Sequence, residues 1–353
     1  MCYKIIDSFN VEERLSITHY INHFSFDYNA VLVAGNGNLN VKHYCGKFNA
    51  YQRTYVIFSK NKQKLNTRYL FHFLNNYMDT LRIRSIGGVI KYIKLEMLTN
   101  IKINLPPLEE QKCIVAILDK TDNIRPKREQ AIKLADDFLK ATFLEMFGDP
   151  IENPDNWEKK QIKTGILDII SGWSAVGKNT PCQTHEIGVL KISSVTSGTF
   201  KPQENKVVVK ASIPKSKKLI LPKKGDLIFS RANTRELVVA ICLINHDYNN
   251  LFLPDKLCSI KINNQKILPE FFVSLIQNEK VRELLTKQAT GTSGSMLNIS
   301  KAKFESTEVI FPPITIQRKY ADIFKKYTEW KEKINQSYYI KNELFNSLNT
   351  RVF

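Results

Sequence analysis

Short apolar runs separated by turn residues form the dominant pattern in the second half of this chain. Five such runs, rich in β-branched residues, lie at residues 188–192, 206–209, 226–230, 237–241 and 258–262. Runs of this length and composition predict strands. The pattern then becomes helical, and one helix is predicted at about 269–289. Together these elements predict an α+β domain with an irregular, loop-rich sheet.

Helical periodicity is strongest in two segments that follow Pro106-Pro107 and Pro312-Pro313, where apolar residues recur at three- and four-residue spacing. We expect two long helices that pack antiparallel as a coiled coil, each about 60 Å long at ~1.5 Å per residue. A kink or short break is expected at Pro126. An ordinary helical hairpin without a spacer role is the alternative. The apolar faces comprise Ile114, Ile117, Leu118, Ile132, Ala135, Phe138, Leu139, Thr142, Phe143 and Met146 in the first helix, and Tyr320, Phe324, Tyr327, Trp330, Ile334, Tyr338, Phe345 and Leu348 in the second.

The two halves of the chain repeat each other. The sequence LPPLEEQKCIVAILD at 105–119 aligns with FPPITIQRKYADIFK at 311–325, so that Gln111 falls opposite Gln317. Likewise TRYLFHFLNN (67–76) resembles PEFFVSLIQN (269–278), and AVLVAGNG (30–37) resembles DLIFSRAN (226–233). Two copies are too few for a solenoid, so a pseudo-dimer is predicted. Such a pseudo-dimer suits a ligand with approximate two-fold symmetry, and duplex DNA is one.

The first copy is predicted to be shorter than the second. Residues 20–37 align with the region around 221–233, and nothing before them corresponds to residues 157–210. Roughly the first third of the domain would then be absent. This would leave an exposed sheet edge, which is an aggregation risk unless something covers it.

Charge adds an indication of the ligand. The chain carries 52 Lys and Arg against 34 Asp and Glu, a formal net charge of +18. This favours phosphate binding over a surface that is basic only because its proteome is rich in lysine. The six cysteines are scattered, without CxxC or zinc-site spacing, and no signal peptide or membrane span is recognisable. We therefore expect a cytoplasmic protein with no structural metal and no membrane association.

Several segments together resemble a known family. LPPLEEQKCIVAILDKTD, followed by a long helix, resembles the central helical region of type I restriction-modification specificity (S) subunits. GDPIENPDNWEKKQIKTGILDIISG resembles the start of a second target-recognition domain of such subunits, and GVLKISSVTSGTFKPQENKVV and PKKGDLIFSRANT resemble its body. The resemblance covers essentially residues 20–353.

The resemblance implies a non-catalytic DNA-binding subunit that directs adenine methylation and restriction by partner subunits at a bipartite site. It implies an α+β fold in which two target-recognition domains are separated by two long antiparallel coiled-coil helices, as a pseudo-two-fold repeat. The expected parts are a truncated first target-recognition domain at 1–104, a central spacer helix at 105–148, a second target-recognition domain at 149–310 and a distal spacer helix at 311–353. The expected partners are double-stranded DNA, methyltransferase (M) subunits and restriction (R) subunits.

Two other functions are open alternatives. One is a stand-alone or defective DNA-binding fragment of such a subunit. The other is a metal-dependent nuclease, because Pro154, Asp155, Glu158 and Lys160 match the residue types of a PD-ExK motif. These residues crowd into one turn, whereas nuclease carboxylates are spread over adjacent strands so that they converge on a cation. A simple loop cluster is therefore favoured.

A glycine-rich segment resembles a nucleotide-binding loop, but its context argues against that function. Gly172–Lys178 fits the GxxxxGK spacing. Asn179 stands where a magnesium-binding Ser or Thr is needed, and Pro181 prevents the helix that should follow. We therefore expect no cofactor, and the segment could instead contact the DNA backbone.

Polar loops supply the candidate DNA contacts, since Arg and Lys pair with guanine edges, Asn pairs with adenine, and many such residues reach phosphate. The first choice is the loop after the strand at 226–230, and the second is the loop at 290–295. For each residue, a solvated loop position without DNA contact is the alternative. The full set is Arg231, Asn233, Thr234, Arg235, Trp173, Lys178, Thr292, Ser293, Asn36, Asn38, Lys47 and Arg53.

Overall fold

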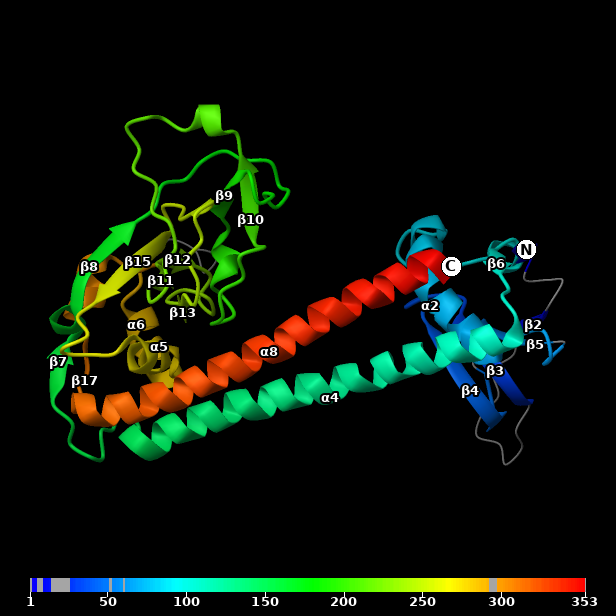
Figure 1. Ribbon diagram of the computed structural model, residues 1–353, viewed down its shortest axis with the longest axis horizontal. Helices are drawn as coiled ribbons and strands as arrows, with labels where there is room; N and C mark the ends of the chain where they lie inside the picture. The colour runs from blue at the N-terminus through cyan, green and yellow to red at the C-terminus, as the bar shows by residue number, and fades with distance from the viewer. Residues whose placement is uncertain are drawn as a thin grey trace. The chain divides into compact units, whose positions relative to one another are not determined.

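A computed structural model describes residues 2–4, 9–13, 26–50, 53–59, 61–291 and 297–352, which form two compact units (Figure 1). The first unit comprises Met1–Ala131 and Lys333–Phe353, and the second comprises Ile132–Glu332. Each unit combines small sheets with helices, so the predicted α+β class is confirmed. The long helices α4 (Leu108–Phe147) and α8 (Ile314–Val352) each contribute one part to each unit.

The second unit is built on a four-stranded antiparallel sheet in the order β13-β11-β15-β8. Its strands are β8 (Ile166–Ser171), β11 (Leu227–Ser230), β13 (Ile241–Leu243) and β15 (Leu257–Ile262). A smaller mixed sheet consists of β9 (Ile187–Leu190), β10 (Asn205–Val208) and β14 (Leu251–Phe252). Two further strand pairs are β7 (Lys159–Gln161) with β17 (Glu308–Ile310), and β12 (Ala232–Asn233) with β16 (Leu297–Asn298).

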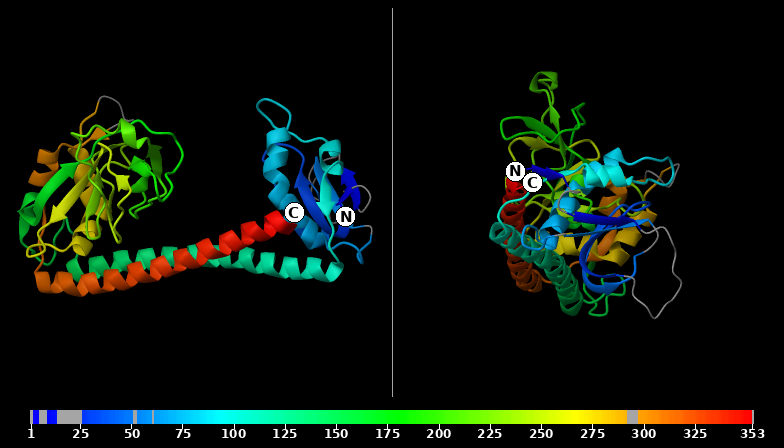
Figure 2. Two further views of the ribbon diagram at one scale, coloured as in Figure 1. Left: turned by 45° about the horizontal axis from the view of Figure 1, so that its top comes forward. Right: turned by 90° about the vertical axis from the view of Figure 1, so that its right-hand side faces the viewer.

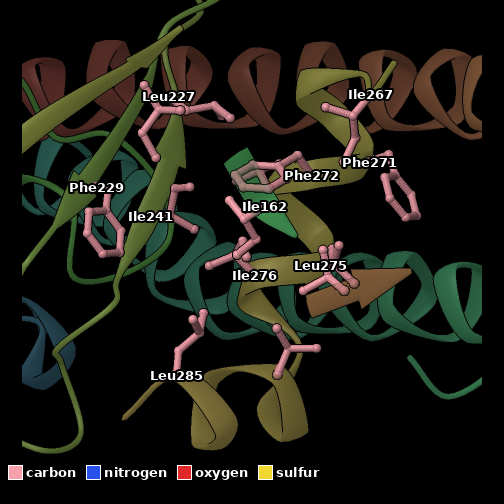
Figure 3. Packing of buried hydrophobic residues seen from close by; sticks show 14 of the residues in the cluster. Ile162, Leu227, Phe229, Ile241, Ile267, Phe271, Phe272, Leu275, Ile276 and Leu285 are labelled. Carbon is pink, nitrogen blue, oxygen red and sulfur yellow. The ribbon is translucent and has the colours of Figure 1, made fainter. Parts of the chain in front are cut away.

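Helices cover the core of the second unit. They are α5 (Pro269–Gln277), α6 (Glu279–Lys287) and α7 (Lys301–Ser306), and short 3₁₀ turns lie at Ile162–Gly165, Ile192–Ser194 and Lys210–Ser212. Phe229 and Ile241 from the main sheet belong to one buried cluster with Phe272 and Ile276 of α5 and Leu285 of α6 (Figure 3). Burying a side chain of this size contributes roughly 1.5–3 kcal/mol, so this cluster holds the sheet and the helices together.

The first unit has a sheet of its own, in the order β2-β5-β3-β4 and antiparallel throughout. The strands are β2 (Phe9–Glu13), β3 (Phe26–Ala34), β4 (Val41–Phe48) and β5 (Thr54–Ser59), and β1 (Cys2–Lys4) pairs separately with β6 (Lys102–Asn104). Helix α2 (Thr67–Arg84) packs against β3 and β4 (Figure 2), and α3 (Leu95–Thr99) follows it.

The expectation that the first copy has no counterpart of residues 157–210 is wrong for β7 and β8, the strands that begin that range. Its strand order β2-β5-β3-β4 matches β8-β15-β11-β13 strand for strand, and the pair β1–β6 matches β7–β17. The strands at residues 2–4 and 9–13 therefore supply two elements that we expected to be missing, and β2 covers the edge of β5. For the later part of that range the expectation holds, since the described part of the first unit contains no counterpart of the small sheet β10-β9-β14, and β9 and β10 lie within residues 157–210. Strands this short and divergent leave too little pattern to align.

A buried glutamine repeats at the start of both long helices. The side-chain oxygen of Gln111 accepts a hydrogen bond from Asn66 N (2.9 Å), and its Nε2 donates to the carbonyls of Lys64 and Pro106. The oxygen of Gln317 accepts from Leu268 N (2.8 Å), and its Nε2 donates to the carbonyls of Lys266 and Pro312. Both side chains are fully buried. The alignment that placed Gln111 opposite Gln317 is thus confirmed.

Helices α4 and α8 run antiparallel, as predicted. In the second unit Phe143 near the end of α4 packs on Tyr320 near the start of α8. Asp136, which is earlier in α4, accepts hydrogen bonds from Tyr327 and Lys331, which are later in α8. In the first unit Arg128 donates to Asn335 Oδ1 (2.8 Å). Partner numbers rise along one helix as they fall along the other, which only an antiparallel pair allows.

Two details of the helices differ from expectation. Helix α4 continues through Pro126 without a break. Residues 122–127 are exposed there, so water can bind the carbonyl of Asp122, which loses its helical partner. Ile117 and Phe138, placed on the seam by periodicity, are instead 46% and 60% exposed. Tyr338, Phe345 and Leu348 lie outside the residues whose side chains are described.

Two elements of the second unit also differ. Residues 235–239 form a turn rather than the strand expected at 237–241, and Val239 adopts a positive φ of 68°. Val238 and Val239 are fully buried within this turn. Their apolar character therefore reflects burial and does not indicate a strand. The single helix expected at 269–289 is two helices, because Asn278 ends α5 and caps α6 by accepting from Lys280 N and Val281 N.

Candidate functional site

The loop after β11 carries the first-choice residues, and its backbone is held on both sides. Arg231 N donates to the Lys256 carbonyl (3.1 Å), and the Arg231 carbonyl accepts from Ile299 N (2.9 Å). One residue further, Ala232 and Asn233 pair with Asn298 and Leu297. The polar loop Arg231–Arg235 is therefore fixed at the end of the main sheet, where a strongly apolar strand gives way to side chains that can face a ligand.

Arg231 is half-buried, and its Nε has no hydrogen-bond partner among the residues that the structure describes. Burial raises the pKa of the nearby Cys258 thiol, and this effect outweighs those of its hydrogen bond with Ser171 and of the charge of Arg231, both of which lower the pKa. The charge of Arg231 thus acts on a thiol that burial keeps neutral. An unsatisfied donor on a charged group is costly. A ligand acceptor reached by rotating the side chain would remove that cost.

The remaining residues of this loop divide into turn formers and exposed charge. Asn233 Oδ1 accepts from Thr234 N (2.8 Å), and the Thr234 carbonyl accepts from Leu237 N and Val238 N. The amide nitrogen of Asn233 can therefore donate to a ligand. For the two-bond contact with adenine, the side-chain oxygen would have to give up its hydrogen bond from Thr234 N. Arg235 is exposed and borders a shallow, charged groove together with Glu236, Glu279, Arg282, Glu283, Thr286 and Lys287.

The first unit holds an equivalent loop in the same way. Gly35 N donates to the Arg53 carbonyl (2.8 Å), and the Gly35 carbonyl accepts from Ile93 N (2.9 Å). Asn36 then pairs with Tyr92, as Ala232 pairs with Asn298 in the second unit. The structure thus brings Asn36, Asn38 and Arg53 to one end of the sheet, with Asn38 and Arg53 exposed.

Lys47 does not belong to this group. It lies on β4 opposite Asp27, at the far end of the β3–β4 hairpin from the loop. Lys47 lies six residue steps along the strand from Val41, which corresponds to about 20 Å at ~3.3 Å per residue. Its side chain is exposed and available only for a separate contact.

The glycine-rich segment connects the two sheets of the second unit. Trp173 N donates to the Leu253 carbonyl (2.9 Å), and its ring stacks on Phe252 with centroids 6.2 Å apart. A Cβ on Gly172 would lie 2.0 Å from the Leu253 oxygen, so glycine is required by close backbone packing. No helix follows, since Lys178 bridges Val207 instead. The geometry of a nucleotide-binding loop is therefore absent. Trp173 packs internally, whereas Lys178 is exposed.

Thr292 and Ser293 lie outside the described residues. The hairpin that flanks them is described, because Thr290 and Asn298 exchange two hydrogen bonds of 2.9 Å. Sequence reasoning missed Lys256, whose carbonyl holds Arg231 in place. Its signal was the equivalence with Arg53, which becomes visible only once both loops are folded.

The nuclease alternative gains no support. Glu158, just before β7, forms an ion pair with Lys160 on that strand (2.8 Å). Across the described ranges, no group of three or more His, Cys, Asp or Glu side chains could hold a metal ion. In the same part of the chain no helix is long and apolar enough to cross a membrane, and Cys45, Cys113, Cys182, Cys242 and Cys258 are free thiols.

Comparison with known proteins gives one consistent family. The family model described as "Type I restriction modification DNA specificity domain" matches residues 5–134 and 154–344. The chain is 25% identical to the EcoKI specificity subunit of Escherichia coli over 302 residues, covering 81% of this chain and 64% of that protein. It is 26% identical to the Escherichia coli EcoEI specificity subunit over 193 residues, covering 53% and 32%. The chain spans about a third of the length of the first curated relatives that it matches.

The fold is also shared with a solved structure. The crystal structure of the type I restriction-modification S subunit from M. genitalium superposes with a TM-score of 0.67, at 12% sequence identity, and covers 100% of this chain and 96% of that one. At this identity the likeness establishes the fold, including the two sheet-bearing units and the long helices.

Proposed function

Because the chain belongs to the family of type I restriction-modification DNA specificity domains, we propose that it reads a split DNA site and directs partner subunits to it. Each unit reads one half of the site. Methyltransferase subunits then methylate adenine, and restriction subunits cut the DNA. The chain itself is not catalytic.

The observation that carries this proposal is that each unit holds an equivalent loop at the end of its own four-stranded sheet. Arg231–Arg235 and Gly35–Asn38 follow equivalent strands and are held by equivalent backbone bonds, through Lys256 and Ile299 in one unit and through Arg53 and Ile93 in the other. A repeated reading loop suits a ligand with two half-sites. The net charge of +18 supplies the attraction to phosphate. Exposed lysines such as Lys215, Lys217 and Lys218 contribute to it without reading sequence.

The long helices offer a surface for the methyltransferase. On the part of α4 within the second unit, Leu134 and Phe138 are 62% and 60% exposed. Burial of apolar side chains of this size under a partner protein stabilises the complex. We assign this face to the M subunits, which would place the catalytic partner on the elements that carry the reading units.

A second candidate function rests on the reduced first unit. Within its described residues nothing matches the small sheet β10-β9-β14. If that sheet contributes to DNA contact, the chain would read one half-site strongly and the other weakly. It would then act as a partial or stand-alone DNA-binding protein.

The test is to co-express the chain with the M subunit encoded beside it, purify the complex, and sequence the adenine methylome of the cells. The first proposal predicts a stable complex and a methylated motif with two specified halves separated by unspecified base pairs. A one-sided or symmetric motif would support the second candidate. DNA binding without any M complex would also support it. A stable complex without methylation, or no complex and no DNA binding, would overturn the assignment.

A further inference from the structure

A short turn after α2 exposes apolar side chains at its tip. Val89 is fully exposed and Ile90 is 63% exposed, and Ile86 at the base of the turn is 38% exposed. Single exposed apolar residues are ordinary. Two consecutive ones at the tip of a turn form an apolar surface, and covering that surface with a ligand is favourable. No part of the site described so far uses them.

The turn is rigid. Ile86 N donates to the Tyr92 carbonyl (2.9 Å), and Tyr92 N donates to the Ile86 carbonyl (2.8 Å). Gly87 has φ +107°, and a Cβ there would lie 2.3 Å from the Ile90 oxygen, so the tight turn requires glycine. Val89 and Ile90 are therefore presented in a fixed position, which lowers the ordering cost of binding.

The turn is also joined to the candidate reading loop of the first unit. Gly37 N donates to the Lys91 carbonyl (2.8 Å), and Asn36 pairs with Tyr92. In the second unit the hairpin Thr290–Asn298 holds the equivalent position, because Asn298 pairs with Ala232. A ligand that reaches Asn36 and Asn38 is thus close to the tip.

The charge around the tip favours an anionic ligand. From residue 80 to residue 95 the chain has four basic residues and no acidic one. Arg84, Lys91 and Lys94 are exposed. Apolar groups set among cations and beside asparagines suit a ligand that presents phosphates, polar base edges and methyl groups together. The major groove of DNA does so, and there thymine alone carries a methyl group.

We propose that Val89 and Ile90 contact thymine 5-methyl groups in the half-site read by the first unit. The inference rests on the proposed function and deepens it, since it assigns thymine selection to this turn. The second unit carries Thr290 and Gly291 at the equivalent place, so different side chains would contact its half-site there.

The test uses the complex with the M subunit and a duplex bearing the methylated motif. Each thymine of the two half-sites is replaced in turn by deoxyuridine, which removes only the methyl group. For the natural chain we expect about fourfold weaker binding for each contacted thymine of one half-site, from the loss of one buried methyl. The variant Val89→Ser/Ile90→Ser should bind the thymine duplex correspondingly more weakly and should no longer distinguish thymine from uracil in that half.

Controls separate this inference from the proposed function. Leu167→Ser, at a residue 69% exposed on β8, should leave the uracil response unchanged. The response to single base-pair changes in the other half-site should persist in the double variant, which shows that it is folded. If the natural complex binds no specific DNA, the proposed function fails. If it binds and methylates normally but the double variant keeps its uracil response, or loses only the M subunit, the thymine assignment is wrong. A half-site without thymine would overturn it as well.

Discussion

At the scale of single residues, the buried glutamines show how one side chain fixes a helix to its domain. Gln317 satisfies Leu268 N and two backbone carbonyls from a fully buried position. Gln317→Leu keeps the size but leaves these groups without a partner, at about 1–3 kcal/mol for each buried group. We expect the free energy of unfolding of the second unit to fall by about 3 kcal/mol in chemical denaturation.

The tryptophans allow this prediction to be read out in one unit alone. Trp157, Trp173 and Trp330 are the three tryptophans, and all belong to the second unit. Gln317→Leu should therefore move the fluorescence transition. Gln111→Leu should move only a transition seen by circular dichroism. Gln265→Leu, at an exposed position, is the matched control. Equal stability of Gln317→Leu and Gln265→Leu would contradict the role given to Gln317.

Residues at equivalent places also give the two candidate loops different chemistry. Arg231 of the second unit corresponds to Gly35 of the first. A Cβ on Gly35 would lie 2.5 Å from the Arg53 oxygen and 2.9 Å from Tyr55 Cε2, so no side chain fits there. The first unit is left with Asn36 and Asn38, and the guanine-type contact open to Arg231 has no counterpart at that position.

At the scale of elements, the pairs that attach the globular helices to the long helices have opposite polarity in the two units. Arg68 on α2 bonds Asp119 on α4 (2.7 Å), whereas Glu270 on α5 faces Lys325 on α8 (3.7 Å). Buried His72 donates to Asp119 as well, and burial lowers the pKa of His72, so the imidazole is neutral near pH 7. If α5 packed on α4 instead of α8, Glu270 would face Asp119. The repulsion between the two carboxylates disfavours packing of a globular helix on the wrong long helix.

Lys325→Asp tests this polarity, because it sets two carboxylates against each other. We expect it to lower the fluorescence-detected unfolding free energy of the second unit by about 1 kcal/mol, a value typical of partly exposed pairs. Glu270→Arg/Lys325→Asp copies the polarity of the first unit and should recover most of that loss. If the double variant loses the sum of the two single losses, the pair has no coupling and the polarity has no role.

Elements also show what the sequence could predict. The long helices were predictable because their periodicity extends over about forty positions and each starts after a Pro-Pro pair. The alignment of Gln111 with Gln317 held because both serve the same backbone bonds. The turn around Val239 was mistaken for a strand, because a buried turn and a buried strand are both made of apolar residues. The first strands of the chain were missed, because strands of three to five residues carry too little pattern.

At the scale of the whole molecule, the proposed function requires that the two halves of the DNA site be read independently. Asn36→Ala/Asn38→Ala should relax base preference in one half of the methylated motif, and Asn233→Ala/Arg235→Ala should relax it in the other half. Each lost base contact costs about 1–3 kcal/mol of discrimination. The number of unspecified base pairs between the halves should not change, because neither pair lies on α4 or α8. Lys178→Ala, at an exposed phosphate-type position, should lower the salt dependence of binding without altering the motif. Methylome sequencing of cells carrying each variant measures the base preferences and the spacing, and binding of the purified complex to the motif at several salt concentrations measures the effect of Lys178→Ala. Relaxation of the same half by both loop variants would show that the two units do not divide the site between them.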